Sequence, residues 1–332
     1  MTSPPRTFAT RPPRLRLGDT IGVCAPAGPV LARRLGPGLA LLGQHFAIRL
    51  GPLVAAAMAN PDRAPGRPDQ QAGYLAGDDA ARAAELNALL RDPDVRAIIV
   101  ARGGYGLTRL LPALDGAALA ADPKPLIGFS DATALLAWAL HHGVCGIHGP
   151  VVTQLATLPA EDGAALIAAL TRAEPGPPWQ ALTQVGLDAS ARPGLLAGML
   201  IPGNLIVTCS LVGTPWQLPG VDVIGLLEEV GERPYAIDRC LTQLALAGRL
   251  RWHGAVVGDL TRCTDPPHVA GATDDPAPAH VVVSERLAAA GVPGLAGAPV
   301  GHGARNRAVP FAGQVALDLR RGQLEFLDAA VA

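Results

Sequence analysis

The sequence predicts an α/β protein with two domains: an N-terminal α/β domain built on a parallel sheet, and a smaller, β-rich α+β domain at the C-terminal end. The first observation is that apolar strands alternate with helical patterns up to about residue 155, as in βαβ units. The second is that short strands with glycine turns dominate afterwards, which indicates more antiparallel pairing. The expected boundaries are 14–172 for the first domain, 173–190 for a linker and 191–332 for the second domain.

Composition argues against several classes of protein. The chain has 332 residues, of which 49% are hydrophobic, so it can bury a large core and is too apolar to be disordered. Its 27 basic and 28 acidic residues nearly cancel, which leaves no basic excess for nucleic acid. No segment reads as an apolar membrane span, and the N-terminus lacks the apolar region of a secretory signal. We therefore expect no nucleic-acid partner, no membrane association and a cytoplasmic location.

Periodicity places the elements of the first domain. Apolar runs bounded by turn residues predict strands, and apolar residues at helical spacing predict helices. The aspartates at 78–79 can cap a helix, the Gly-Pro-Gly at 36–38 should break or kink one, and 61–75 is a polar loop. The expected strands are 19–27, 46–54, 95–101 and 125–129, and the expected helices are 30–44, 80–92, 107–111, 132–142 and 160–172.

The second domain is expected to carry fewer helices. Its predicted strands are 195–200, 223–228, 255–260 and 314–319, and its predicted helices are 235–248 and 279–291. In parallel sheets, functional residues gather in the loops that follow the strands. Three such loops in the first domain have unusual sequences, at 25–29, 102–106 and 130–131.

Ser130 lies where a predicted buried strand stops and a helix begins at once. This strand–turn–helix arrangement exposes a serine hydroxyl and points backbone N–H groups to the same place. The helix N-terminus also favours a developing negative charge. The alternative is an ordinary helix cap, in which the serine side chain binds its own helix. The complete G-x-S-x-G pattern is absent, because Ala132 replaces the second glycine.

Two further segments could complete a nucleophilic site. Glu228 and Glu229 close an apolar strand, and a buried carboxylate there could orient a histidine or pair with Arg233. Arg239 is a second candidate partner for such a salt bridge. His302 is the histidine with a glycine on both sides, which leaves its ring accessible; the alternative is an exposed loop histidine. The order Ser, Glu, His along the chain is that of α/β hydrolases.

The segment 102–106, Arg-Gly-Gly-Tyr-Gly, follows a predicted strand. Its glycines could offer N–H groups to an anion, and Arg102 could bind a carboxylate; the alternative is a tight turn with a packed tyrosine. The spacing is not that of a dinucleotide-binding loop. The five cysteines form no C-x-x-C pair and are expected to be buried. We therefore expect neither a metal nor a cofactor.

Taken in order, these motifs resemble those of the LD-carboxypeptidases of the muramoyltetrapeptide carboxypeptidase type, a family of serine peptidases. The resemblance covers about residues 16–320. The matching segments are IGVCAPAG at 21–28, ARGGYG at 101–106, IGFSD at 127–131, GNL at 203–205, LEEV at 227–230, PY at 234–235, IDR at 237–239 and GHG at 301–303.

The resemblance implies a catalytic triad of Ser130, Glu228 and His302, formed across the interface of two domains. It also implies an oxyanion hole made by the backbone N–H groups of Gly104 and Asp131. The family fold pairs a parallel α/β domain with a β-rich C-terminal domain, usually in a homodimer, and needs no metal or cofactor. Of the two glutamates Glu228 matches the triad acid, and the expected role of its neighbour is a salt bridge or a contact at the substrate rim.

By the same resemblance, the substrate is a murein tetrapeptide, cut between its diamino acid and the terminal D-alanine. Arg102 is a candidate ligand for the free carboxylate of that substrate. One alternative within the family is a microcin C-type self-immunity peptidase, but such proteins carry an aromatic-bearing loop for the nucleobase, and only 4% of this chain is aromatic. Another is a non-catalytic binding module, which the intact triad residues argue against. A cysteine hydrolase would need cysteine in place of Ser130.

Overall fold

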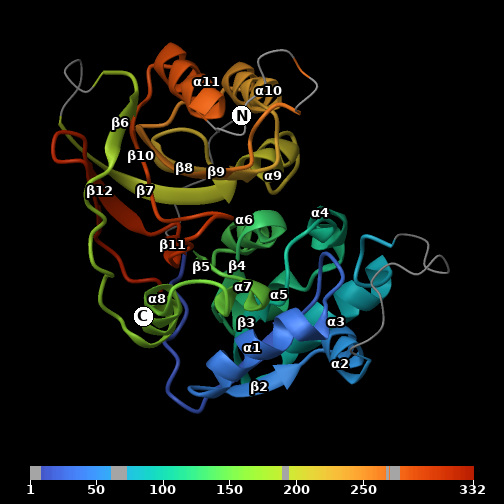
Figure 1. The fold of residues 1–332 in the computed structure, drawn as a ribbon. Coiled ribbons are helices and arrows are strands. Elements are labelled where there is room, and N and C mark those ends of the chain that lie inside the picture. Colours follow the sequence, from blue (N-terminus) through green and yellow to red (C-terminus); the bar gives the residue numbers. More distant parts are fainter. Residues whose placement is uncertain (1–8, 61–72, 189–193, 267–268, 270–276) are drawn as a thin grey trace.

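The computed structural model describes residues 9–60, 73–188, 194–266, 269 and 277–332 (Figure 1). In this part of the chain, a six-stranded sheet forms the centre of the N-terminal region, with strand order β11-β5-β4-β3-β1-β2. Strands β1 to β5 are parallel, which confirms the predicted parallel α/β domain, whereas β11 is antiparallel to β5. These strands are β1 (Thr20–Cys24), β2 (Ala47–Leu50), β3 (Val95–Val100), β4 (Leu126–Gly128), β5 (Gly146–His148) and β11 (Val309–Phe311).

The five helices expected in the N-terminal region are present, but the helices at 52–59, 116–121 and 152–155 were not expected. Helix α1 runs through Pro37 without a break, so of the two effects expected at 36–38, a break or a kink, the break is wrong. Leu35 and Leu42 anchor it in the core, and Gly38 lets it approach α7, since a Cβ atom there would collide with a carbonyl oxygen of α7. These helices are α1 (Ala32–Gly43), α2 (Pro52–Ala59), α3 (Asp79–Arg91), α4 (Leu107–Leu110), α5 (Gly116–Ala121), α6 (Thr133–His141), α7 (Val152–Leu155) and α8 (Ala160–Thr171).

The strand predicted at 46–54 is shorter than expected, because α2 starts within it. Pro52 is the first helical residue, a position where its missing N–H costs nothing. The buried carboxylate of Glu85 accepts hydrogen bonds from the N–H groups of Leu53 (2.9 Å) and Val54 (3.3 Å) and so binds the start of α2. The predicted cap of α3 is confirmed, since the Asp78 side chain accepts from the third helical N–H. Most of the polar loop predicted at 61–75 lies outside the described residues.

A seven-stranded mixed sheet forms the second region, in the order β13-β12-β7-β8-β9-β10-β6. Parallel and antiparallel pairs both occur, which confirms the predicted antiparallel character relative to the first sheet. Its strands are β6 (Thr183–Gly186), β7 (Leu195–Asn204), β8 (Val223–Val230), β9 (Gly254–Thr261), β10 (Pro293–Ala296), β12 (Gln314–Asp318) and β13 (Gln323–Phe326). Its helices are α9 (Leu205–Ser210), α10 (Pro234–Leu246) and α11 (Ala277–Ala289), and the last two lie together on the side away from the first sheet (Figure 1).

Two segments depart from the domain division expected from the sequence. Strand β6 comes from the range 173–190, expected to be a linker, and pairs with β10 at the edge of the second sheet. Strand β11 comes from 191–332 and pairs with β5 of the first sheet. Helix α6 packs between the two regions, where Trp138 and Ile201 belong to one buried cluster. The two regions are therefore joined by shared buried side chains as well as by the chain itself.

Candidate active site

Ser130 occupies a strained turn between β4 and α6. Its φ of 60° places it in the left-handed region, which costs a residue with a Cβ atom free energy. It starts a 3₁₀ turn (Ser130–Ala132) that leads directly into α6. The side chain makes no helix cap, in contrast to the alternative considered from the sequence. The turn is also crowded: a Cβ atom on Gly103 would lie 3.1 Å from the Ser130 Oγ.

The hydroxyl of Ser130 points to His302, and His302 points to Glu228. The Nε2 atom of His302 lies 3.1 Å from the Oγ of Ser130, and its Nδ1 atom lies 2.7 Å from the Oε2 of Glu228. An ionised carboxylate only accepts hydrogen bonds, so Nδ1 carries the proton and Nε2 accepts from the serine. The Glu228 side chain is fully buried and that of His302 is 20% exposed. The residues proposed from sequence thus form a Ser–His–Glu chain with the geometry of a triad.

The three side chains come from both regions of the molecule. Ser130 follows β4 of the first sheet, Glu228 lies on β8 of the second, and His302 lies in the loop between β10 and β11. The glycines beside His302 let this loop pack on β9, because Cβ atoms on Gly301 or Gly303 would collide with Asp259. The site therefore depends on how the two sheets are held together.

Glu229 has a different role from the one expected. The sequence suggested a salt bridge or a contact at the substrate rim, but the side chain is 1% exposed and forms neither. It accepts hydrogen bonds from the Nδ2 of Asn204 (3.0 Å) and the N–H groups of Ile206 (2.8 Å) and Val230 (2.8 Å). Burial raises the pKa of Glu229 to about 7, and these hydrogen bonds act in the opposite direction. Glu229 thus fixes the start of α9.

The expected arginine partners of the two glutamates are engaged elsewhere or lie apart from them. Arg233 pairs with Asp265 at 2.9 Å and lies over the ring of Tyr235. Arg239 also lies over that ring, at 5.6 Å from its centroid. Glu228 pairs with His302 instead, so the salt bridge considered as its alternative is wrong.

A polar cluster that the sequence analysis missed holds the His302 loop against the first region. Asp162 of α8, fully buried, accepts from the guanidinium groups of Arg305 (2.7 Å) and Arg307 (3.3 Å) and from the N–H of Asn306 (3.1 Å). These partners lie a few residues after His302, but no feature of the sequence connects them to Asp162, 143 positions before Arg305.

The same loop is tied to α7. The Nδ2 of Asn306 donates to the Oε1 of Gln154 (2.8 Å), and the Nε2 of Gln154 donates to the carbonyl oxygen of Gly301 (3.2 Å). The N–H of Gly301 donates to the Oδ1 of Asn306 (3.3 Å), so that Gln154, Asn306 and Gly301 are all hydrogen-bonded to one another. The backbone next to His302 is therefore fixed by side chains of the other region.

The loops expected to form the oxyanion hole meet beside Ser130. Gly104 has φ 125° and lies against Gly28, to which a Cβ atom on Gly104 would come within 3.1 Å. The N–H of Gly28 donates to the carbonyl oxygen of Gly103 (3.2 Å). The buried Asp131 carboxylate accepts from the N–H of Leu107 (2.9 Å), and burial raises its pKa. An oxyanion role for the N–H groups of Gly104 and Asp131 stays a prediction.

Arg102 is exposed at the edge of this loop. Its Nη1 donates to the carbonyl oxygen of Pro29 (2.8 Å), and burial together with the nearby charge of Arg34 lowers its pKa. No carboxylate of the described residues lies within ion-pair distance of Arg102, so its charge is open to an anionic ligand. The packed tyrosine considered as the alternative is not seen, since Tyr105 is 50% exposed and faces the ring of Tyr74.

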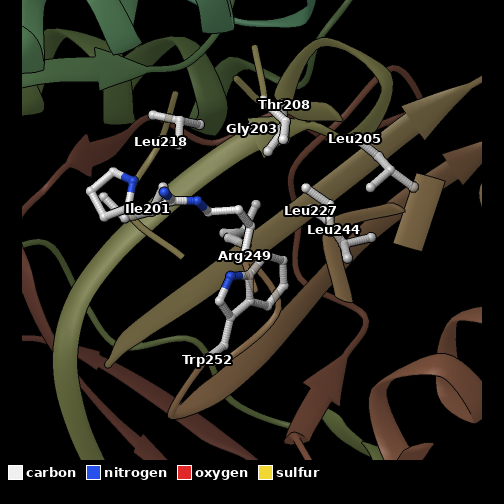
Figure 2. A pocket seen from close by; sticks show the side chains of 12 residues that line it. Ile201, Gly203, Leu205, Thr208, Leu218, Leu227, Leu244, Arg249 and Trp252 are labelled. Atoms are coloured by element: carbon white, nitrogen blue, oxygen red, sulfur yellow. The ribbon is translucent and has the colours of Figure 1, made fainter. Parts of the chain in front are cut away.

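A small cavity lies beside strands β7 and β8 of the second sheet, and none of the triad residues lines it (Figure 2). Its volume is about 20 Å³, and apolar side chains together with Thr208, Arg249 and Trp252 surround it. This is room for one water molecule and too little for a peptide. Among the described residues, no three His, Cys, Asp or Glu side chains are placed to hold a metal ion. Within the same residues, no helix has the length and apolarity to cross a membrane.

Comparisons with known proteins agree with this arrangement. Residues 21–149 match the LD-carboxypeptidase N-terminal domain, and residues 197–317 match the LD-carboxypeptidase C-terminal domain. A murein tetrapeptide carboxypeptidase of Pseudomonas aeruginosa is 35% identical over 75% of this chain and 80% of its own length. A Bacillus subtilis protein named "Probable murein peptide carboxypeptidase" is 31% identical over 93% of this chain and 91% of its own.

Solved structures show the same fold. A muramoyltetrapeptide carboxypeptidase from Oxalobacter formigenes superposes with a TM-score of 0.72 and 27% identity, over 93% of this chain and 99% of that one. The microcin self-immunity protein MccF, in complex with glutamyl sulfamoyl guanosine, gives a TM-score of 0.78 at 22% identity, over 98% of this chain and all of the other. With both family domains matched along its length, this chain belongs to the LD-carboxypeptidase family.

Proposed function

We propose that the protein is a serine-type LD-carboxypeptidase that removes the terminal D-alanine from murein tetrapeptides. The observation that carries the proposal is the chain of hydrogen bonds from Ser130 through His302 to the buried Glu228. The names of two relatives, each at least 31% identical over three quarters of this chain or more, support the substrate class.

The proposed reaction passes through an acyl-enzyme. The Nε2 of His302 takes the hydroxyl proton as the Oγ of Ser130 attacks the carbonyl carbon of the diamino acid. Glu228 stabilises the imidazolium that forms, and N–H groups of Gly104 and Asp131 hold the oxyanion. The imidazolium then gives its proton to the amine of D-alanine, which leaves. Water, deprotonated by His302, attacks the ester and releases the tripeptide.

Arg102 would bind the free carboxylate of the substrate. Its guanidinium is exposed beside the loop that meets Ser130, and no carboxylate of the described residues forms an ion pair with it. A carboxypeptidase needs such a cation, because its substrate ends in a negative charge that an endopeptidase substrate lacks at this position. We further propose that the enzyme acts in the cytoplasm as a homodimer. Light scattering of the purified protein would test the homodimer.

The second candidate is an activity like that of the microcin self-immunity protein. Its fold superposes as well as that of the muramoyltetrapeptide carboxypeptidase, so the fold does not decide between them. Sequence favours the murein substrate, since the matched self-immunity protein is similar over only 42% of this chain. The low aromatic content argues in the same direction, because stacking on a nucleobase uses aromatic side chains.

Mass spectrometry of purified tetrapeptide muropeptides incubated with the enzyme tests the proposal. We expect a product that lacks one alanine, none with the Ser130→Ala variant, and the same rate after treatment with EDTA and phenanthroline. An aminoacyl sulfamoyl adenosine, incubated in parallel, tests the second candidate. Cleavage of this compound with the tetrapeptide left intact would reject the murein assignment.

A further inference from the structure

His148 is a buried histidine near the triad whose two ring nitrogens form no hydrogen bond with any described residue. It is the last residue of β5, where it pairs with Gly128 of β4 and Val309 of β11. Its side chain is fully buried, and neither ring nitrogen forms a hydrogen bond with any described residue. A buried polar group without a hydrogen bond destabilises the folded protein. We therefore expect at least one of the two ring nitrogens of His148 to have a hydrogen-bond partner.

A further buried atom without a hydrogen bond to the described residues belongs to the triad itself. Glu228 uses Oε2 for His302, but its Oε1 is buried and has no hydrogen bond with any described residue. His148 interacts electrostatically with Glu228 and with His302, and these are the two titratable groups that act on it. The ring of Phe129 contacts both histidines, with its centroid 6.1 Å from that of His148 and 4.6 Å from that of His302. His148 therefore lies on the inner side of the triad.

The protonation state of His148 follows from its surroundings. Burial lowers its pKa to about 4, although the negative charge of Glu228 acts in the opposite direction. A neutral imidazole has one N–H donor and one acceptor nitrogen. A buried water bonds to about three otherwise unsatisfied polar groups, and such waters belong to the folded structure.

We propose that His148 is a positioning residue of the triad, linked to the Oε1 of Glu228 by one buried water. The N–H of His148 donates to the water oxygen, and the water donates to Oε1. This leaves Oε2 free for His302 and keeps the carboxylate ionised and in one orientation. The inference rests on the triad of the proposed function and does not depend on the identity of the substrate.

The proposal predicts a shift in the pH dependence of the reaction. The reactive state has a neutral His302 and an ionised Glu228, and it carries more negative charge than the state with one more proton. A hydrogen bond to Oε1 stabilises the reactive state most, so its loss lets the pair take up a proton at higher pH. Because this hydrogen bond is weakened and not lost when the pair takes up a proton, only the difference between the two states counts, and we expect a shift of about one pH unit.

The test measures how fast a fluorophosphonate probe labels Ser130 between pH 4 and 9, together with turnover of the tetrapeptide. We expect His148→Leu to move the acid limb of labelling upward by about one pH unit and to lower the plateau about tenfold. His148→Gln, which keeps an N–H donor, should restore most of both. Ile147→Val is the matched control, because it alters a buried neighbour on the opposite face of β5 and should leave the acid limb unchanged.

An acid limb in His148→Leu that coincides with those of the wild type and Ile147→Val would overturn the proposal. The wild-type protein offers a readout that does not depend on the folding of the variants. A high-resolution crystal structure should show a water within hydrogen-bond distance of Glu228 Oε1 and His148. The absence of a water between these two groups would also overturn the proposal. If the probe gives the expected shift while the tetrapeptide is not cleaved, the inference stands and the proposed substrate fails.

Discussion

At the scale of single residues, strain and function coincide at Ser130. Its left-handed backbone places the hydroxyl 3.1 Å from His302, in a turn that cannot at the same time cap the following helix. For residues with a Cβ atom, this backbone conformation is less stable by about 1–2 kcal/mol. The rest of the turn, with Gly128 before it and Gly103 beside it, has no room for larger side chains.

Substitutions of Ser130 should separate activity from stability. Ser130→Ala keeps the strain and removes the nucleophile, so turnover should fall by several orders of magnitude while the melting temperature stays unchanged. Ser130→Gly should be equally inactive but more stable by about 1 kcal/mol, because glycine adopts this φ without cost. Calorimetry and a turnover assay on the same preparations check both. Turnover near the wild-type level in either variant would reject Ser130 as the nucleophile.

Glu228 and Glu229 should respond differently to the same change. Glu228→Gln removes the charge that stabilises the imidazolium of His302, so kcat should fall about 10²- to 10⁴-fold. Glu229→Gln keeps the triad intact and should change kcat little. It should instead lower the free energy of unfolding by about 1–3 kcal/mol, because an amide nitrogen cannot accept from the N–H of Ile206. A larger loss of kcat in Glu229→Gln than in Glu228→Gln would show that the assignment is off by one residue.

At the scale of elements, the position of His302 depends on helices of the other region. Asp162 of α8 and Gln154 of α7 hold the segment that follows β10 by a closed set of hydrogen bonds around Asn306. Such contacts fix a catalytic group without touching the substrate, and a displacement of 1 Å can cost a hundredfold in rate.

Breaking this link should slow the chemical step more than it weakens binding. Asn306→Ala removes the hydrogen bonds to Gly301 and Gln154, so we expect kcat to fall about tenfold with KM nearly unchanged. Arg11→Ala serves as a control, since Arg11 forms an ion pair with Asp328 but does not contact the loop. Equal kinetics for the two variants would show that the link has no positioning role.

At the scale of the whole molecule, local signals were readable from the sequence and long-range pairings were not. The end of a strand at Ser130, and the pair of glutamates that closes a later apolar strand, are properties of a few consecutive residues. The pairing of β11 with β5 joins segments about 160 residues apart, and no periodicity encodes it. The continuity of α1 through Pro37 also depends on a distant contact, because packing against α7 outweighs the local effect of proline.

Buried ionisable groups make the stability of the whole chain depend on pH. For an acid whose pKa is raised on folding, the folded state binds more protons than the unfolded state, so stability is lost as pH rises between the two pKa values. For Glu229 this window runs from about 4.5, the ordinary value, to about 7. Burial raises the pKa of Glu85 and Asp131 in the same direction. His148, with its pKa lowered to about 4, has the opposite effect, since its stability is lost as pH falls below the ordinary value of about 6.5.

Because these effects overlap in pH, the free energy of unfolding of one variant is best compared with that of the wild type at each pH. Glu229→Gln cannot titrate, whereas His148, Glu85 and Asp131 titrate in both proteins and cancel in the difference. The stability advantage of the wild type over Glu229→Gln should therefore be largest near pH 4.5 and shrink by about 1–3 kcal/mol by pH 7.5. Urea unfolding of both proteins across this range gives the difference directly. A difference that stays constant or grows with pH would mean that Glu229 is ionised throughout, and that its three N–H donors outweigh its burial.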